Sequence, residues 1–305
     1  MGAEQKTHFK VDRSKCIQCG KCVNTCSGMV ITFGKDGYPE MREFERYGWR
    51  GCWRCQHCLA VCPVGAISIF DKKPENSLPP VPPEMGGYME RLIVNRRSCR
   101  GFLNKNVEPK VISGMLRAMS AAPTGGNSCN VEYTVIDDVD RVHEIWEAAY
   151  SKMEEDAKKH IYTHSFSDFY YDKMKKSEKT VRKDDLLLCG APHIFIAHER
   201  CVGKWAEDSK VNCIIATAYF ELLCNAHGLG SVIMSYPAEV LNELAPEARK
   251  MLGIPADHYT GLMVGFGYPE ITYARGVQKD RGKKIHRYTD GKNASATPSA
   301  LQELL

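Results

Sequence analysis

Cysteine is the residue type that carries most of the recognisable chemistry in this chain. The 305 residues include 14 cysteines, and eight of them lie between residues 16 and 62. These eight form two runs with the same spacing, C-x2-C-x2-C-x3-C: Cys16, Cys19, Cys22 and Cys26, then Cys52, Cys55, Cys58 and Cys62. Local crowding of this kind, in a chain for which no secretory leader is expected, favours metal binding over a disulfide framework.

The spacing resembles that of bacterial two-cluster ferredoxins, in which the fourth cysteine of each run binds the other [4Fe-4S] cluster. The resemblance implies two ligand sets: Cys16, Cys19 and Cys22 with Cys62, and Cys52, Cys55 and Cys58 with Cys26. A zinc ribbon is the alternative, but it would leave the third and fourth cysteine of each run without a role. Pro63 follows the second run, whereas Ser27 follows the first.

A group of arginines forms a second candidate site. Arg96, Arg97 and Arg100, with the hydroxyl of Ser98, provide cations and hydrogen-bond donors suited to a phosphate. Three arginines in five residues also occur on ordinary solvated surfaces, so this segment alone leaves both interpretations open. No G-x-G-x-x-G fingerprint follows a strand and no P-loop motif occurs, so Rossmann and nucleoside-triphosphatase chemistry are not indicated.

Five segments in order change that balance: NRRSCRGF (95–102), APTGGNSCN (122–130), GAPHIFIA (190–197), HGLGSVIMSY (227–236) and LGIPADHYTGLMVGFGYP (252–269). Together they resemble the nitroreductase family of FMN-dependent oxidoreductases over residues 89 to about 285. The resemblance implies an α+β sandwich that binds FMN and forms a homodimer. Such a domain behind a two-cluster ferredoxin domain is a known arrangement in anaerobic bacteria.

The resemblance also implies which residues contact the flavin. Its phosphate and ribityl chain are assigned to Arg96, Arg97, Ser98 and Arg100, and its ring to Ile233, Met234 and Ser235. Residues Pro123, Thr124 and Asn127 are expected to touch the flavin held mainly by the other subunit. Lys279, with Arg275 or Arg281 as alternatives, is expected to return to the phosphate. Cys129-Asn130 stands where a Gln-Pro pair is common in the family. No catalytic side chain is nominated, and none of the ten histidines is assigned to a metal or to catalysis.

The elements that must position these residues divide at a proline-rich segment. Residues 1–70 are the predicted ferredoxin domain, with short strands at 29–33, 38–41 and 66–70. Residues 71–88 contain five of the 15 prolines and predict an extended linker without helix. Residues 89–290 are the predicted FMN domain, and residues 291–305 a small polar tail.

Within the predicted FMN domain, apolar periodicity indicates alternating helices and strands. One helix is expected to open at Glu108-Pro109 and to stop at Pro123. Further helices are expected around 142–149 and over 208–227, with strands at 133–137, 193–197 and 261–267. Apolar residues on several faces of the helix at 208–227 predict a central position or a subunit interface. The charged, aromatic-rich segment 151–185 is either a substrate lid or a surface helical pair.

The sequence therefore predicts an FMN-dependent oxidoreductase that receives electrons through two [4Fe-4S] clusters and reduces a small organic acceptor. The expected donor is a low-potential protein such as a ferredoxin, or NAD(P)H. The alternatives are a non-enzymatic iron–sulfur and flavin electron carrier, or a flavin reductase acting on enones or aryl halides. The near balance of 41 Lys plus Arg against 37 Asp plus Glu does not predict nucleic-acid binding. No membrane span and no signal core are seen, so a cytoplasmic location is expected.

Overall fold

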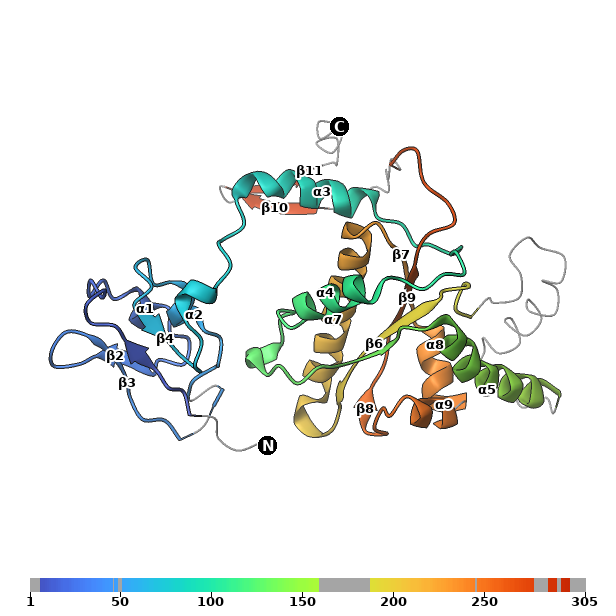
Figure 1. Cartoon of the computed structure of the whole chain (residues 1–305), viewed down its shortest axis with the longest axis horizontal. Coiled ribbons are helices and arrows are strands. Elements are labelled where there is room, and N and C mark those ends of the chain that lie inside the picture. Colours follow the sequence, from blue (N-terminus) through green and yellow to red (C-terminus); the bar gives the residue numbers. More distant parts are fainter. Residues whose placement is uncertain are drawn as a thin grey trace.

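The cysteine-rich N-terminal part lies beside a larger C-terminal part, and the proline-rich segment connects them (Figure 1). The computed structural model describes residues 6–45, 47–48, 51–158, 187–244, 246–276, 285–289 and 292–296. Within these ranges, no helix is both long and apolar enough to cross a membrane.

Two small antiparallel sheets and two one-turn helices build the N-terminal part. β1 (Lys10–Val11) pairs with β4 (Ile67–Ser68), and β2 (Ile31–Phe33) pairs with β3 (Pro39–Met41). α1 (Lys21–Asn24) and α2 (His57–Ala60) each contain the third cysteine of a run. A buried apolar cluster that includes Val30, Leu59 and Ile69 packs against the cysteines. All three predicted strands form here, each shorter than predicted.

The proline-rich segment differs from the prediction because it contains helical turns. Two 3-10 turns, Pro74–Asn76 and Pro83–Met85, each begin with proline, and α3 (Gly86–Asn95) starts directly after the second. Proline is tolerated at the first position of a helical turn, where its missing N–H has no partner to lose. α3 begins two residues before the predicted end of the linker and has no buried side chain.

An antiparallel sheet with strands of unequal length forms the centre of the C-terminal part. Its strand order is β5 (Glu132–Ile136), β6 (His193–Arg200), β9 (Met263–Gly267) and β7 (Gly230–Met234), and β8 (His258–Tyr259) pairs with the end of β6. Side chains of β6 alternate between the two faces: Ile194 and Ile196 enter one core cluster, and Phe195 and Ala197 enter the other. Both faces of β6 are therefore buried.

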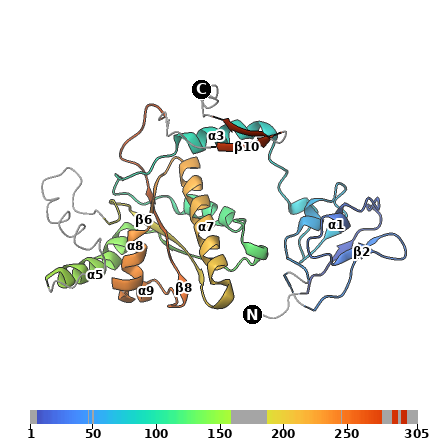
Figure 2. The same cartoon turned by 180° about the vertical axis from the view of Figure 1, so that it is seen from behind.

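Helices cover each face of this sheet (Figures 1 and 2). On one face lie α4 (Pro109–Met119) and α7 (Ala206–Ala226), where Phe220 stacks on Phe195 with ring centroids 3.8 Å apart. The other face is covered by α5 (Val139–Lys158), α8 (Tyr236–Glu239), a π-helical turn (Val240–Leu244) and α9 (Pro246–Met251). The predicted α+β sandwich is confirmed.

The long helix α7 is central, as its sequence predicted, but part of its apolar surface is uncovered. Val211, Ile214 and Tyr219 are exposed on it. The helix ends before Gly228, whose φ of 73° is the left-handed conformation expected of a C-terminal cap.

Two further predictions concern the 151–185 segment and the C-terminal tail. α5 continues to Lys158, but most of the 151–185 segment lies outside the described residues, so neither the lid nor the helical pair is tested. The tail predicted from residue 291 contributes β11 (Lys292–Ala296), which pairs with β10 (Ile285–Thr289). A regular strand therefore forms where the composition suggested an irregular end.

Candidate redox site

The two cysteine runs fold into loops of matching backbone conformation. Gln18 and Gly20 in the first run have positive φ angles, and so do Arg54 and Gln56 at the equivalent positions of the second. Each loop then enters its one-turn helix, α1 or α2. Alternation of left-handed and ordinary residues turns successive N–H groups toward one side, which forms a cradle for a negatively charged group. The spacing repeat is thus also a structural repeat.

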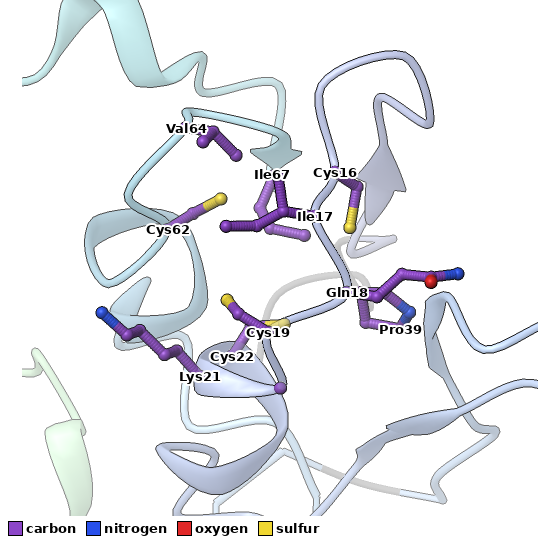
Figure 3. Close-up of a pocket in the computed structure, with 11 residues that line it drawn as sticks. Cys16, Ile17, Gln18, Cys19, Lys21, Cys22, Pro39, Cys62, Val64 and Ile67 are labelled. Atoms are coloured by element: carbon purple, nitrogen blue, oxygen red, sulfur yellow. The ribbon is translucent and has the colours of Figure 1, made fainter.

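The fourth cysteine of the second run lies with the first run. Cys16, Cys19, Cys22 and Cys62 line one pocket, together with Ile17 and Lys21 (Figure 3). Burial raises the pKa of Cys22, and the neighbouring sulfurs of Cys62 and Cys16 raise it further. We call these four residues the first cysteine set.

The fourth cysteine of the first run lies, in turn, with the second run. Burial raises the pKa of Cys58 to about 12, and the nearby Cys52, Cys55 and Cys26 also raise it. Burial raises the pKa of Cys52 as well, with Cys55 and Cys26 contributing. We call Cys26, Cys52, Cys55 and Cys58 the second cysteine set. Each set offers four sulfurs to one centre, which is the donor set that a cubane cluster requires.

The two sets differ in their exposure. In the first set only Cys22 is buried, and Cys19 is exposed. In the second set both Cys52 and Cys58 are buried. A cluster bound by the second set is therefore better shielded from solvent than one bound by the first.

The predicted phosphate-binding arginines occupy different environments. Arg96 donates from Nη1 to the carboxylate of Glu221 on α7 over 2.6 Å, and Glu221 is buried. Arg97 donates from Nη1 to the carbonyls of Val94 and Arg96. Its Nε is buried and has no hydrogen-bond partner among the described residues. Arg100 is exposed. Arg97 therefore has a buried donor available for an acceptor group such as a phosphate oxygen.

The segment that contains the three arginines, residues 95–100 (the arginine segment), lies close to the backbone of two other parts of the chain. Ser98 forms an isolated parallel β-bridge with Ser231 on β7, and the Cys99 N–H donates to the Ser231 carbonyl over 2.8 Å. A Cβ at Gly230 would lie 2.6 Å from the Cys99 sulfur, so only glycine lets this segment lie against β7. A Cβ at Gly276 would lie 2.3 Å from Asn95 Oδ1 and 3.9 Å from Arg97 Nη2. The chain after β9 therefore returns to the arginine segment.

The remaining predicted flavin contacts are spread over two elements. At the end of β7, the strand that Ser98 contacts, Ile233 is exposed and Met234 is buried, and the next residue, Ser235, is exposed. Four residues of extended chain place Ser235 about 13 Å from Ser231. Arg275 is exposed, whereas Lys279 and Arg281 lie outside the described residues.

Loop 123–129, which contains the other predicted flavin contacts, is held by hydrogen bonds within itself and to two other parts of the chain. Pro123 is exposed, and the hydroxyl of Thr124 accepts from the Cys129 N–H over 3.0 Å. Asn212 on α7 accepts from the Gly125 N–H over 2.9 Å. Asn127 donates from Nδ2 to the carbonyl of Trp53 over 2.8 Å. The loop thus touches the second cysteine run, a contact that the sequence analysis missed.

Comparisons with known proteins agree with this arrangement. A family model described as the nitroreductase family matches residues 93–268, which is more than half of the chain. The chain belongs to the nitroreductase family. A model described as a 4Fe-4S dicluster domain matches residues 15–100. This member of the family is therefore an oxidoreductase with an N-terminal iron–sulfur ferredoxin domain.

Individual relatives match one domain or the other. A protein of Archaeoglobus fulgidus named "Putative NADH dehydrogenase/NAD(P)H nitroreductase" is 24% identical over 200 residues, which is 65% of this chain and 95% of the relative. An uncharacterized ferredoxin of Methanocaldococcus jannaschii is 37% identical over 65 residues, 21% of this chain and 80% of the relative. A crystal structure of a nitroreductase with bound FMN from Desulfitobacterium hafniense has a TM-score of 0.50 and 19% identity, covers 65% of this chain and 97% of that one, and supports the fold.

Proposed function

We propose that this nitroreductase-family protein uses FMN to reduce a small organic acceptor, with electrons supplied through two [4Fe-4S] clusters of its own N-terminal domain. The observation that carries the proposal is the contact between Asn127 and Trp53. It joins a loop between two cluster cysteines to a loop in which flavin contacts are expected. The two cofactor domains are then parts of one electron path.

The cysteine sets support the cluster half of this proposal. The first set is assigned to one cluster and the second set to the other, and iron–sulfur clusters supply one-electron transfer. Backbone N–H groups assist the sulfurs: Ala66 donates to Cys62 over 3.2 Å and Arg54 donates to Cys52 over 3.4 Å. Hydrogen bonds to cluster sulfurs adjust the potential of such centres.

The flavin half rests on the arginine segment and on the fold. The related solved nitroreductase from Desulfitobacterium hafniense is described with bound FMN, and this chain shares its fold. We assign the phosphate to Arg97 and Ser98, with Arg100 at the exposed edge and Arg96 held in place by Glu221. The ring is assigned to Ile233, Met234 and Ser235, with Pro123, Thr124 and Asn127 as further contacts. A bound flavin would accept single electrons and release them in pairs to an acceptor.

The order of the clusters follows from exposure. Ile17 and Trp53 occupy equivalent positions, each directly after the first cysteine of its run. Ile17 is 61% exposed beside the first cysteine set, whereas Trp53 contacts the flavin domain beside the second. We therefore assign the first set to electron entrance from an external low-potential donor and the second set to transfer onward to the flavin.

Loop 123–129, in which flavin contacts are expected, is held by a series of buried polar side chains. Asn212 donates to Glu199 over 3.0 Å, and both side chains are buried. The same Asn212 side chain accepts from the Gly125 N–H. Buried, fully paired polar groups fix a single arrangement of the atoms they join. These hydrogen bonds keep loop 123–129 at a constant position relative to α7.

Uncovered apolar surface supports a homodimer. α3 has no buried side chain, and Tyr88, Met89, Ile93 and Val94 are exposed on it. α7 adds Val211, Ile214 and Tyr219. We propose that a second copy of this chain covers these two helices. The structure describes all fourteen cysteines and places none of them in a disulfide bond, which suits the reducing cytoplasm that we propose as the location.

One experiment tests the enzyme against its alternatives. The anaerobic protein, analysed for iron, sulfide and FMN, is reduced and then mixed with nitroaromatics, quinones, enones, halophenols or an oxidised redox protein. The proposal predicts both cofactors and rapid reoxidation by at least one small organic acceptor. Reoxidation by the redox protein alone would identify an electron carrier and reject the proposed enzyme. Absence of FMN after reconstitution would reject the flavin assignment.

A further inference from the structure

Three side chains from neighbouring strands meet at one end of the central sheet. Glu132 on β5 is directly opposite His198 on β6, and His258 on β8 is opposite Arg200 on β6. Because side chains alternate along a strand, Glu132, His198 and His258 project from the same face. One carboxylate oxygen and one ring nitrogen of each histidine all lie within 4.8 Å of one another. None of these residues belongs to the redox site.

The ring of His198 is held in a defined orientation. His198 is buried, and its Nε2 lies 2.9 Å from the hydroxyl of Thr134, which is on the same face of β5. Its Nδ1 lies 2.9 Å from Nδ1 of His258. When Nε2–H is donated to Thr134, the lone pair of Nδ1 points at His258. Histidines that bind metals have the same outer hydrogen bond, which fixes the tautomer and the ring plane.

The charged groups around these side chains are already engaged elsewhere. Arg249 donates to the carbonyls of Pro255 and His258 and to the side chain of Asn242. Arg200 pairs with Asp257 over 2.8 Å. Among the three candidate ligands, the charged group is therefore the carboxylate of Glu132, and its negative charge favours a cation.

We propose that Glu132, His198 and His258 bind one divalent transition-metal ion of the zinc type, with water as the fourth ligand. Imidazole and carboxylate donors suit Zn²⁺, and three protein ligands with one open position is a geometry that zinc adopts. Two nitrogens bound to a tetrahedral zinc ion lie about 3.3 Å apart. The two Nδ1 atoms, now 2.9 Å apart, need to separate by about 0.4 Å. All three ligands lie on strands, and strands position the residues of a site more precisely than loops do.

The site is tested on the full-length protein with its iron–sulfur clusters loaded, so that the cluster cysteines are occupied. Zn²⁺ is added against a competing chelator, and zinc and iron are counted per chain. X-ray absorption at the zinc edge then identifies the ligands. We expect one zinc per chain with nitrogen and oxygen neighbours at about 2.0–2.2 Å and no sulfur at about 2.3 Å.

Variants assign the zinc to these residues. His258→Gln removes a ligand and should weaken zinc binding by more than the roughly 10- to 100-fold that loss of an outer hydrogen bond costs. Thr134→Val should weaken it within that roughly 10- to 100-fold range. His227→Gln, at an exposed histidine after α7, is the matched control and should leave zinc binding unchanged. Iron content should be equal in all variants.

Three results would overturn the proposal: zinc bound only through sulfur, equal zinc affinity in His258→Gln, or no zinc bound by the native protein. In the last case the two rings share an ordinary N–H···N hydrogen bond. If His258→Gln does not fold, Glu132→Gln gives the same test at an exposed position, where the substitution leaves the sheet intact. Unchanged zinc affinity in that variant would also reject the site.

Discussion

Asn127 donates its side-chain amide to the backbone carbonyl of Trp53 over 2.8 Å, although 74 residues separate the two in the sequence. Trp53 follows Cys52 of the second cysteine set, and Asn127 lies in the loop that Asn212 anchors to α7. The hydrogen bond therefore connects the shielded cluster site with the flavin domain through a short stretch of ordered backbone.

Breaking this hydrogen bond should slow electron delivery. Asn127→Ala removes the donor, and a net loss of about 0.5–1.5 kcal/mol corresponds to a roughly 2- to 10-fold lower population of the docked arrangement. We expect a similar fall in ferredoxin-driven turnover, expressed per bound FMN and measured anaerobically. Asn130→Ala, at an exposed position three residues on, is the control. Equal rates in the two variants would show that the contact has no part in transfer.

The prediction that the fourth cysteine of each run binds the cluster of the other run can be tested by counting iron in double variants. Cys62→Ala alone should remove about four of about eight irons per chain. Adding Cys16→Ala should remove no more iron, because both cysteines serve the first set. Adding Cys52→Ala instead should remove both clusters. The reverse pattern, with Cys52 and Cys62 equivalent, would mean that each run binds its own cluster.

Arg97 should contribute directly to FMN affinity. Its buried Nε has no partner among the described residues, and a hydrogen bond to a charged group is worth about 1.5–3 kcal/mol. Arg97→Ala should therefore raise the Kd for FMN by about 10- to 100-fold, with no change in iron content. Equilibrium titration of the flavin-free protein measures this. Arg91→Ala, on the exposed side of α3, should bind FMN normally. A normal Kd for Arg97→Ala would refute the phosphate assignment.

Arg96 has a structural role that must be separated from any contact with the flavin. Arg96→Ala leaves the buried carboxylate of Glu221 without its partner, and an uncompensated buried charge is strongly destabilising. We expect a clear fall in Tm for Arg96→Ala and a recovery in the double variant Arg96→Ala/Glu221→Gln. Both are measured by thermal unfolding under anaerobic conditions. A Tm for the double variant as low as that of the single one would argue against this ion pair.

Local spacing in the sequence predicted that the three close cysteines of each run lie together on one loop, whereas the place of each fourth cysteine came from the resemblance to two-cluster ferredoxins. The helices α4 and α7 were likewise marked by their apolar periodicity. β1 was not, since two residues carry no periodic signal. α3 was missed because Pro83 and the glycines at 86 and 87 suggested an extended linker.

Contacts between distant segments could not be predicted in this way. Arg96 and Glu221 are 125 residues apart, and His198 and His258 are 60 apart. Their pairing depends on which strands are neighbours and on which face of a helix meets the sheet. The arginine segment therefore suggested a phosphate site without revealing that one arginine is committed to a carboxylate. The histidines, having no motif, gave no indication that two of them meet.

We propose that electrons reach the flavin through the second cysteine set, and anaerobic rapid mixing can follow this transfer. Native protein and Cys55→Ala, each with FMN bound, are mixed with a reduced low-potential ferredoxin while flavin reduction is followed. Dithionite-driven reduction of a nitroaromatic is the control for an intact flavin site. We predict that Cys55→Ala keeps its FMN and its dithionite-driven activity but loses most of its ferredoxin-driven flavin reduction. Ferredoxin-driven reduction at the native rate in that variant would show that electrons reach the flavin without the second cysteine set.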